Sequence, residues 1–382
     1  GLTEGKKCSV CGAVITAQQA IPTQGHDYSD GVCRNCGDIK DGFALVEGTW
    51  GWYKDGTLQT SLTGVIKGSK AGETGWYYIE NGLCKQSTGW AQRADGSNSV
   101  WYYIVGGVYT KGTGLVKGII NGKSGWYYAK SGAYTSVTGL AQRADGSNDA
   151  WYYVEDGVYT KATGLARKAD GSSTTWYYVK NGTYTKATTV AQRIDGAYKG
   201  ILFYVLKGAY SKVNGFAKYD DTTWGWFVNG QLQTGMNGIV KGTIDSRTAW
   251  HFIKNGIYTR VSGIAQRADG ANTVWYYVKD GVLDESATGI AQKADGSNTK
   301  WYYVRDGVYT KATGISKKVD KSEDNAWYYV YNGAYTKATV ITGRADGSNS
   351  LKYYVYNGKF NSYNGYVTVG GFTYYLVKGV VQ

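Results

Sequence analysis

The sequence predicts an all-β protein: an elongated β-hairpin solenoid of about 13 tandem repeats of about 25 residues, preceded by a small zinc-ribbon-like domain. Three observations predict this fold class. A Trp-Tyr-Tyr motif recurs at a nearly constant step, the 382 residues include 56 Gly but only one Pro, and four cysteines form two C-x-x-C pairs ahead of the first motif. We therefore expect a four-cysteine knuckle domain over residues 1–46 and the repeat array over residues 47–382.

The first element in the chain is the knuckle domain. Cys8 and Cys11 belong to one C-x-x-C-G segment, and Cys33 and Cys36 belong to a second one. Two such segments can supply four thiolates in a tetrahedral array, so we expect a structural zinc ion whose binding drives the folding of this domain. Two disulfides are the alternative, because a secreted context favours them. His26 lies between the segments and is expected to be a turn residue rather than a ligand.

The repeats follow, and their anchor is the aromatic motif. Five motifs open at an unbroken step of 25 residues, at Trp76, Trp101, Trp126, Trp151 and Trp176. Degenerate copies open at Trp52, Leu202, Trp226, Trp250, Trp275, Trp301, Trp327, Lys352 and Phe372. A unit of this length cannot bury a core by itself, whereas stacked units can, so we expect each repeat to pack on its neighbours.

One repeat, residues 139–163, contains all the expected elements. Residues 139–143 are a short extended run, and residues 144–148 (Ala-Asp-Gly-Ser-Asn) are a turn, because Asp-Gly adopts the positive φ that tight hairpins need. The aromatic and β-branched residues 151–154 are a strand. A second turn, closed by a glycine that recurs in almost every copy, leads to a third strand over residues 158–162.

The aromatic side chains are expected to divide between core and surface. Alternation along the strand places Trp151 and Tyr153 on one face and Tyr152 and Val154 on the other, so we expect one face to pack between repeats and the other to be partly exposed. A Trp that recurs in every unit is expected to build the core. The Tyr of the third strand is expected to be exposed and to contact a ligand, at Tyr109, Tyr134, Tyr159, Tyr184, Tyr258, Tyr309 and Tyr335.

Basic residues recur at two positions of the repeat. One cation precedes the first turn of each repeat, and we call this row of cations the ladder. The candidate ligand contacts in it are Arg93, Arg143, Lys168, Arg193, Arg267, Lys293 and Arg344. Lys67, Lys117, Lys218, Lys241 and Lys318 extend this ladder. A second set follows the second turn, at Lys111, Lys161, Lys186, Arg260, Lys311 and Lys337. Rows of like charge repel one another, so they favour an anionic polymer as partner; alternatively, they keep strand edges soluble.

The repeat resembles a known family. Units of the form W-Y-Y-V-x-x-G followed by T-G-[LI]-A are similar to the cell-wall-binding repeats of Gram-positive surface proteins, a superfamily that includes choline-binding modules, glucan-binding repeats and the binding regions of clostridial toxins. The run Val-Leu-Asp-Glu-Ser-Ala-Thr-Gly-Ile-Ala at residues 282–291 resembles repeats of surface proteins of gut Firmicutes. Residues 1–26 are similar to the knuckle modules of those proteins.

The resemblance implies a secreted or cell-surface protein that binds a glycan or wall polymer. In choline-binding modules a Thr-Gly-Trp supplies one aromatic wall of each choline site. Here Thr-Gly-Trp occurs only at residues 74–76 and 88–90, which makes Trp90 a candidate wall, and most repeats carry Leu, Ile or Val instead. This departure argues against choline recognition through cation–π contacts at most repeats.

Composition argues against catalysis within this chain. It contains only two His, and the recurring Asp residues lie one per repeat, so they do not converge as an active site requires. The net charge of +13 favours polyanionic partners, no apolar run is long enough to span a membrane, and no nucleic acid is expected without a groove-entering helix. We expect a non-catalytic binding module. The alternatives are a stalk or adhesin that binds a host protein, or the anchoring region of a larger secreted hydrolase.

Overall fold

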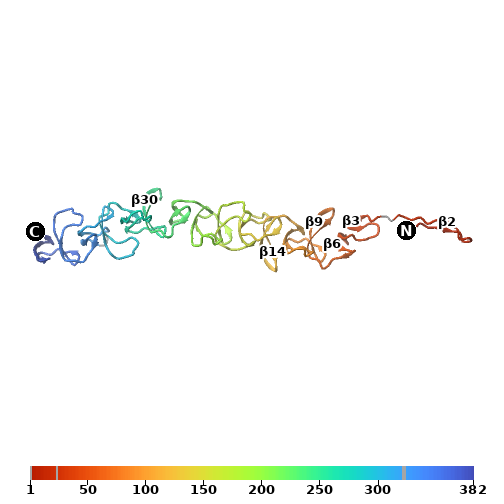
Figure 1. Ribbon diagram of the computed structural model, residues 1–382, viewed down its shortest axis with the longest axis horizontal. Coiled ribbons are helices and arrows are strands. Elements are labelled where there is room, and N and C mark those ends of the chain that lie inside the picture. Colours follow the sequence, from red (N-terminus) through yellow and green to blue (C-terminus); the bar gives the residue numbers. More distant parts are fainter. Residues whose placement is uncertain (1, 23–24, 321–323) are drawn as a thin grey trace. The chain divides into compact units, whose positions relative to one another are not determined.

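The computed structural model describes residues 2–22, 25–320 and 324–382. Within these ranges every regular element is a β-strand (Figure 1), so the all-β fold class is confirmed. The described residues include no helix with the length and hydropathy that crossing a membrane would need. Gly1, Thr23 and Gln24, which belong to the segment that resembles a knuckle module, lie outside the described residues.

The chain divides into two compact units. The first comprises Gly1–Thr174 and Val179–Tyr184, and the second comprises Thr175–Tyr178 and Thr185–Gln382. Both units are built from the same repeated set of three strands. The division falls inside the repeat array, because a single repeat pattern continues through both units.

In the described residues, strands β5 to β46 form fourteen consecutive sets of three, close to the number of repeats expected. The first strands of the sets are β5 (Gly42–Val46), β8 (Gly64–Lys70), β11 (Gly89–Ala91), β14 (Gly114–Ile120), β17 (Gly139–Ala141), β20 (Gly164–Ala166), β23 (Thr189–Ala191), β26 (Gly215–Lys218), β29 (Gly238–Ile244), β32 (Gly263–Ala265), β35 (Gly289–Ala291), β38 (Gly314–Ser316), β41 (Val340–Thr342) and β44 (Gly365–Val369).

The second strands carry the aromatic motif. They are β6 (Thr49–Lys54), β9 (Glu73–Glu80), β12 (Tyr102–Val105), β15 (Lys123–Lys130), β18 (Tyr152–Glu155), β21 (Tyr177–Lys180), β24 (Phe203–Leu206), β27 (Trp224–Val228), β30 (Arg247–Lys254), β33 (Tyr276–Lys279), β36 (Tyr302–Arg305), β39 (Tyr328–Tyr331), β42 (Tyr353–Tyr356) and β45 (Phe372–Val377).

The third strands are pairs of residues that close each set. They are β7 (Thr57–Leu58), β10 (Leu83–Cys84), β13 (Val108–Tyr109), β16 (Ala133–Tyr134), β19 (Val158–Tyr159), β22 (Thr183–Tyr184), β25 (Ala209–Tyr210), β28 (Gln231–Leu232), β31 (Ile257–Tyr258), β34 (Val282–Leu283), β37 (Val308–Tyr309), β40 (Ala334–Tyr335), β43 (Lys359–Phe360) and β46 (Val380–Val381).

Pairing within and between repeats follows one rule. Inside a repeat the three strands form consecutive antiparallel hairpins, as when Val154 of β18 pairs with Gly139 of β17 and Tyr159 of β19. The second strand also pairs with the third strand of the next repeat, as Tyr127 does with Val158. A short parallel bridge joins successive first strands, and in this repeat it links a Leu to the Arg of the ladder. Within each unit, successive repeats are therefore hydrogen-bonded to one another.

The glycine of the second turn has the role that the sequence predicts. In the turn between β18 and β19, Asp156 has φ of 49° and Gly157 has φ of 79°. A Cβ at Gly157 would lie 2.5 Å from the carbonyl oxygen of Thr135 in the preceding repeat. The glycine is needed both for the left-handed backbone and for this close approach between repeats.

The core does not follow the alternation expected from one strand. Tyr153 is 2% exposed and Val154 is fully buried, although they point to opposite faces. Val154 packs with Leu115, Tyr128 and Ala141 of two neighbouring sets. The prediction of one packed and one exposed face is therefore wrong at these two positions, because the strand is covered both by its own hairpin and by the adjacent repeat.

The N-terminal region contains two separate short hairpins. In the first, β1 (Lys6–Lys7) pairs with β2 (Val14–Thr16), and in the second, β3 (Tyr28–Ser29) pairs with β4 (Val32–Cys33). The strand Gly42–Val46, which the sequence analysis placed in the knuckle domain, pairs along its whole length with β6. Its Phe43 packs against Trp52 of the array. The array therefore begins before residue 47.

Candidate functional site

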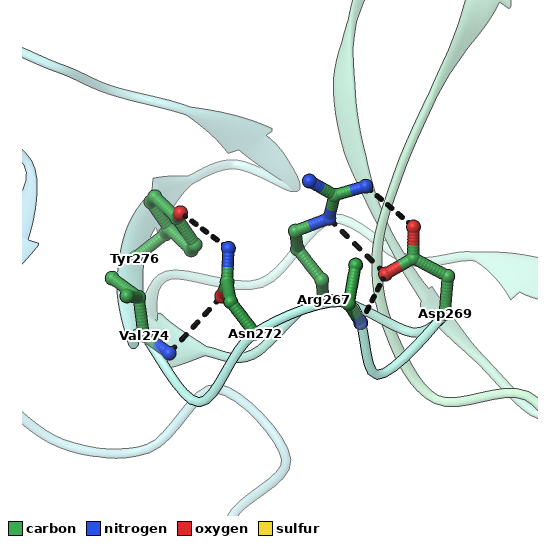
Figure 2. A network of polar contacts seen from close by, with 6 residues as sticks. Arg267, Asp269, Asn272, Val274 and Tyr276 are labelled. Atoms are coloured by element: carbon green, nitrogen blue, oxygen red, sulfur yellow. Dashed lines mark hydrogen bonds and ion pairs between the residues drawn. The ribbon is translucent and has the colours of Figure 1, made fainter.

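The Ala-Asp-Gly turns hold the ladder cations in place. In the repeat shown in Figure 2, the Arg267 guanidinium donates to both carboxylate oxygens of Asp269, and the Nε–Oδ1 distance is 3.1 Å. The backbone N–H of Ala271 also donates to Asp269, at 3.0 Å. Further along, the side chain of Asn272 donates to the hydroxyl of Tyr276. The turn therefore fixes its Asp, and the Asp orients the Arg.

Eight ladder cations lie over the Trp of the preceding repeat. The distances from the charged group to the ring centroid range from 3.8 Å, between Arg193 and Trp176, to 4.6 Å, between Arg267 and Trp250. The other pairs are Arg93 with Trp76, Arg143 with Trp126, Lys168 with Trp151, Lys293 with Trp275, Lys318 with Trp301, and Arg344 with Trp327. Such contacts are attractive because the face of the ring is negative.

The contact at Trp126 is an aromatic cage. Leu115, Trp126, Arg143, Tyr152 and Tyr159 line a hollow of about 200 Å³. The guanidinium carbon lies 4.4 Å from the Trp126 centroid and 5.6 Å from the Tyr152 centroid. Tyr152 and Tyr159 meet edge to face. The walls therefore come from two successive repeats, and the cation belongs to the second of them.

These contacts engage, within the chain, the ladder cations that the sequence analysis offered as ligand contacts. All seven candidate cations are half-buried, and the side chains of Arg93, Arg193 and Arg267 expose 27%, 20% and 27% of their surface. Several are also paired with the Asp two residues later. The ladder as read from the sequence mixes two positions: Lys67, Lys117, Lys218 and Lys241 lie one residue earlier in the repeat, and they are exposed.

The candidate tyrosines are half-buried rather than exposed, so that expectation is wrong. All seven are half-buried. The hydroxyl of Tyr109 donates to the carbonyl of Ser131 at 2.8 Å, and Tyr134 donates to Asp156 at 2.9 Å. These two hydroxyls, and that of Tyr258, thus anchor the second turn of the following repeat. The sequence signal that could have identified this role is the fixed spacing between this Tyr and the turn glycine of the next repeat.

The second set of cations is the one that faces solvent. Lys111, Lys161, Lys186, Arg260, Lys311 and Lys337 are all exposed. None of them forms an ion pair with a described residue. Ser136, Thr234 and Glu285 interrupt the set, and at the last of these Leu283-Asp284-Glu285 replaces the usual Tyr-Thr-Lys. The change leaves a hollow of about 660 Å³ beside Trp250, lined in part by Asp284 and Glu285.

The two C-x-x-C segments of the knuckle lie in different surroundings. None of their four cysteines forms a disulfide among the described residues. One ligand atom each from His26, Cys33 and Cys36 lies within 4.8 Å of the other two, and the Cys36 Sγ and His26 Nδ1 atoms are 3.5 Å apart. In the part of the chain that the structure describes, Cys8 and Cys11 are not members of this group. His26, which the sequence analysis expected to be a turn residue, lies beside Cys36 and within this group.

The surroundings of Cys33 favour its thiolate. Burial by itself raises the pKa of this thiol, but hydrogen bonds from His26, from the backbone of Asn35 and from Cys36 outweigh burial. The result is a pKa of about 6 for Cys33. Thiolates and imidazoles are the ligands that zinc prefers in structural sites, so the residue types of this group suit zinc.

The chain is similar to choline-binding repeat proteins. Residues 70–84, 170–183 and 270–284 match a family model described as choline-binding repeat, which confirms the resemblance expected from the sequence. No curated protein matches the chain. Among solved structures, CbpJ from Streptococcus pneumoniae TIGR4 is 22% identical and has a TM-score of 0.29, with 84% of this chain and 100% of that chain covered.

Two further solved structures are of the choline-binding protein F. The crystal form II structure, from Streptococcus pneumoniae, is 18% identical, with a TM-score of 0.27 and coverage of 81% of this chain and 98% of that chain. The complex of CbpF with ipratropium is 17% identical, with a TM-score of 0.32 and coverage of 77% of this chain and 99% of that chain.

Proposed function

We propose that the chain is a non-catalytic module of a bacterial cell surface that attaches to an anionic cell-wall polymer through its second set of cations. The observation that carries the proposal is the exposure of these cations at one position of six repeats. Each is free of ion pairs with described residues, so each can meet a phosphate or carboxylate of a partner. Many weak contacts on one chain then act together.

The similarity to choline-binding repeats supports a wall polymer as the partner. A family model described as choline-binding repeat matches three segments of the chain, and we therefore take a choline-containing wall polymer as the ligand class. A teichoic acid carries negative phosphates along its backbone, which suits a chain of net charge +13. The chemistry that we propose is therefore attraction between basic side chains and polymer phosphates, without covalent change in either partner.

The proposal is tested by retention on purified teichoic-acid-bearing wall material in a salt gradient. We expect wild-type chain to elute at higher salt than a variant with five reversals in the second set: Lys111→Glu, Lys161→Glu, Lys186→Glu, Lys311→Glu and Lys337→Glu. The matched control reverses five exposed lysines that end second strands: Lys54→Glu, Lys130→Glu, Lys180→Glu, Lys254→Glu and Lys279→Glu. If both variants elute at equally lowered salt, net charge alone explains retention, and the proposal is contradicted.

Free choline distinguishes the two parts of such a polymer. If phosphates are the groups recognised, millimolar choline leaves retention unchanged while salt abolishes it. Release by choline at constant ionic strength would instead assign the binding to trimethylammonium groups.

A spacer that presents a surface to a host protein is the second candidate. The observation that favours it is that the half-buried tyrosines and the ladder cations are engaged within the chain. This candidate predicts no retention on wall material at any salt concentration. Attachment of the same array to a separate catalytic domain is compatible with the first candidate and is tested in the same way.

A further inference from the structure

The contact between successive repeats is built in two alternative ways. We call this contact the joint. Two positions, counted from the first residue of the first strand of a repeat, define it. The wall position is the next residue in one repeat. The plug position is the fourth residue after the first one, in the following repeat. In the cage described above, Leu115 is at the wall position and Arg143 is at the plug position.

In the first kind of joint the wall is aliphatic and the plug is a cation. Within the units, seven such joints combine Val65 with Arg93, Leu115 with Arg143, Leu140 with Lys168, Ile239 with Arg267, Ile264 with Lys293, Ile290 with Lys318 and Ile315 with Arg344. The cation lies over a Trp in every one. The wall residues are 1–2% exposed.

In the second kind of joint the wall is aromatic and the plug is glycine. The pairs are Phe43 with Gly68, Trp90 with Gly118, and Phe216 with Gly242. A Cβ at the glycine would lie 2.8 Å, 2.7 Å and 2.7 Å, respectively, from the ring of its partner, so no side chain fits there. The wall ring instead meets the aromatic residues of the next repeat: Trp90 meets Tyr127 and Tyr134, and Phe216 meets His251 and Tyr258.

Joints without the motif Trp have neither arrangement. Where Leu202 replaces the Trp, the wall is Val190 and the plug is Tyr219, which packs in an apolar cluster. Where Lys352 replaces it, the plug is Val369. A cation therefore stands at the plug position only where a Trp is present to receive it and no aromatic wall already fills the space.

We propose that the aromatic cages of the first kind are binding sites for a positively charged group that the chain itself supplies. The same space holds an aromatic wall ring in some joints and the plug cation in others. A charge that only kept the surface soluble would not alternate with a buried ring in this way. Cages of Trp and Tyr recognise quaternary ammonium groups in general. Because Arg or Lys already lies over the Trp ring, an ammonium compound from solution must displace that cation to reach the ring face. The plug cation determines what the cages exclude.

The first test opens one cage. Arg143→Ala removes the plug at Trp126, and we expect this variant to gain a saturable quenching or enhancement of Trp fluorescence with choline, together with a choline-dependent rise in Tm that exceeds any rise in wild type. Arg143→Lys is the control, since Lys fills the same position at Lys168, and it should behave as wild type does. A folded Arg143→Ala variant whose choline response matches that of wild type would overturn the proposal.

The second test converts one kind of joint into the other. It remains informative even if opening the cage destabilises the fold. Leu115→Phe alone crowds Arg143, and Arg143→Gly alone empties the cage, so each should lower the midpoint of chemical unfolding. The double variant reproduces the pairing of Phe216 with Gly242, and its midpoint should exceed that of either single variant. Additive losses would show that wall and plug do not share a space, and the proposal would fail. Neither test involves wall polymer, so both are independent of the proposed function.

An independent observation concerns the knuckle region. His26, Cys33 and Cys36 bring an imidazole and two sulfurs within 4.8 Å of one another, and each is of a type that zinc takes. Cys33 is almost fully buried, at 2% exposure, which is typical of a structural ligand. We infer that the second C-x-x-C segment holds zinc with His26 as its third protein ligand, in place of the four-thiolate site that spacing alone predicts.

Metal content of the intact chain tests this ligand set. We expect one zinc per wild-type chain by mass spectrometry of the digested protein, and thiolate-to-metal absorption on replacement by Co²⁺. His26→Ala should weaken metal retention against a chelator by at least tenfold, whereas Cys8→Ser with Cys11→Ser should leave retention unchanged. The reverse pattern would restore the four-thiolate site, and a wild-type chain that binds no metal would also contradict the inference.

Discussion

At the scale of single residues, repeated side chains have different roles where their neighbours differ. Most second strands carry Tyr directly after the motif Trp, but one repeat carries His251 there. It is 3% exposed, packs edge to face against Phe216 and Tyr258, and neither of its ring nitrogens has a hydrogen-bond partner among the described residues. Burial lowers the pKa of His251 below its usual 6.5, because a charged ring would be poorly solvated there.

This burial predicts a pH dependence of stability. The folded chain keeps His251 neutral while the unfolded chain protonates it near pH 6.5, so the contribution is full above that pH and is lost as pH falls below it. His251→Phe removes the titrating group and resembles Phe203 at the equivalent position. We expect the unfolding midpoint of wild type to fall between pH 7.5 and 5.5 and that of the variant to change less. Parallel curves would contradict this account.

Residue roles were only partly predictable from sequence. The cation at Arg143 could be found from its recurrence, but its contact with Trp126 joins residues of different repeats that no local pattern connects. The same reason hid the anchoring role of Tyr109, whose acceptor is a carbonyl in the next repeat. The contact of His26 with Cys36 could not be predicted either, because the fold of the knuckle and not its spacing brings the ring there.

At the scale of elements, the turns and first strands set how closely repeats approach. Gly139 opens β17 with φ of 150°, and a Cβ there would lie 2.7 Å from both the nitrogen of Ala169 and the carbonyl oxygen of Arg167. Gly146, in the following Ala-Asp-Gly turn, also has a positive φ, of 64°, but a Cβ would meet nothing within 4 Å. Two glycines only seven residues apart thus serve different purposes.

The pair supports a matched prediction. Gly146→Ala should cost about 1 kcal/mol, from backbone strain alone, whereas Gly139→Ala should cost about 2–4 kcal/mol because the neighbouring strand must also move. Urea unfolding monitored by Trp fluorescence measures both. A Gly139→Ala variant no less stable than Gly146→Ala would show that the repeats can separate at this point without loss.

Element boundaries followed well from the sequence where the signal is local. The Asp-Gly turns and the recurring turn glycine are present, and the strand expected over 151–154 is Tyr152–Glu155, because propensity and turn chemistry decide these elements within a few residues. The third strand, expected over 158–162, is only Val158–Tyr159. The assignment of Gly42–Val46 to the knuckle domain was wrong because that strand lacks the aromatic motif and is specified by its pairing with β6.

At the scale of the whole molecule, the same small stabilising contribution from a turn aspartate recurs in many repeats. The carboxylate of Asp145 accepts a hydrogen bond from the backbone N–H of Ser147, which, with the Ser147 side chain and nearby Arg143, lowers the pKa of this Asp below 3.8. The same direction holds at Asp95, Asp170, Asp220, Asp269, Asp295 and Asp346. In a repeat protein, stability is roughly a sum over units and the contacts between them.

Acid should therefore unfold the array steeply. Each such Asp stabilises the fold above about pH 3.8, and the contribution is lost as pH falls through its lowered pKa. We expect a variant with Asp145→Asn and Asp170→Asn to be less stable than wild type at pH 7 and to lose less on going to pH 3. Circular dichroism at fixed temperature measures both. An unchanged acid response would mean that these turns open before their carboxylates are protonated.

The two kinds of joint also bear on how such a gene can change length. Wall and plug lie in different repeats, so a duplication or deletion keeps them matched only when it exchanges segments bounded by the same kind of joint. Recombination between unlike boundaries would set Phe216 against an arginine, or leave Leu115 facing a glycine. Insertions and losses should consequently accumulate inside the run of aliphatic joints from Ile239 to Arg344, while the aromatic joints on its flank stay fixed in number.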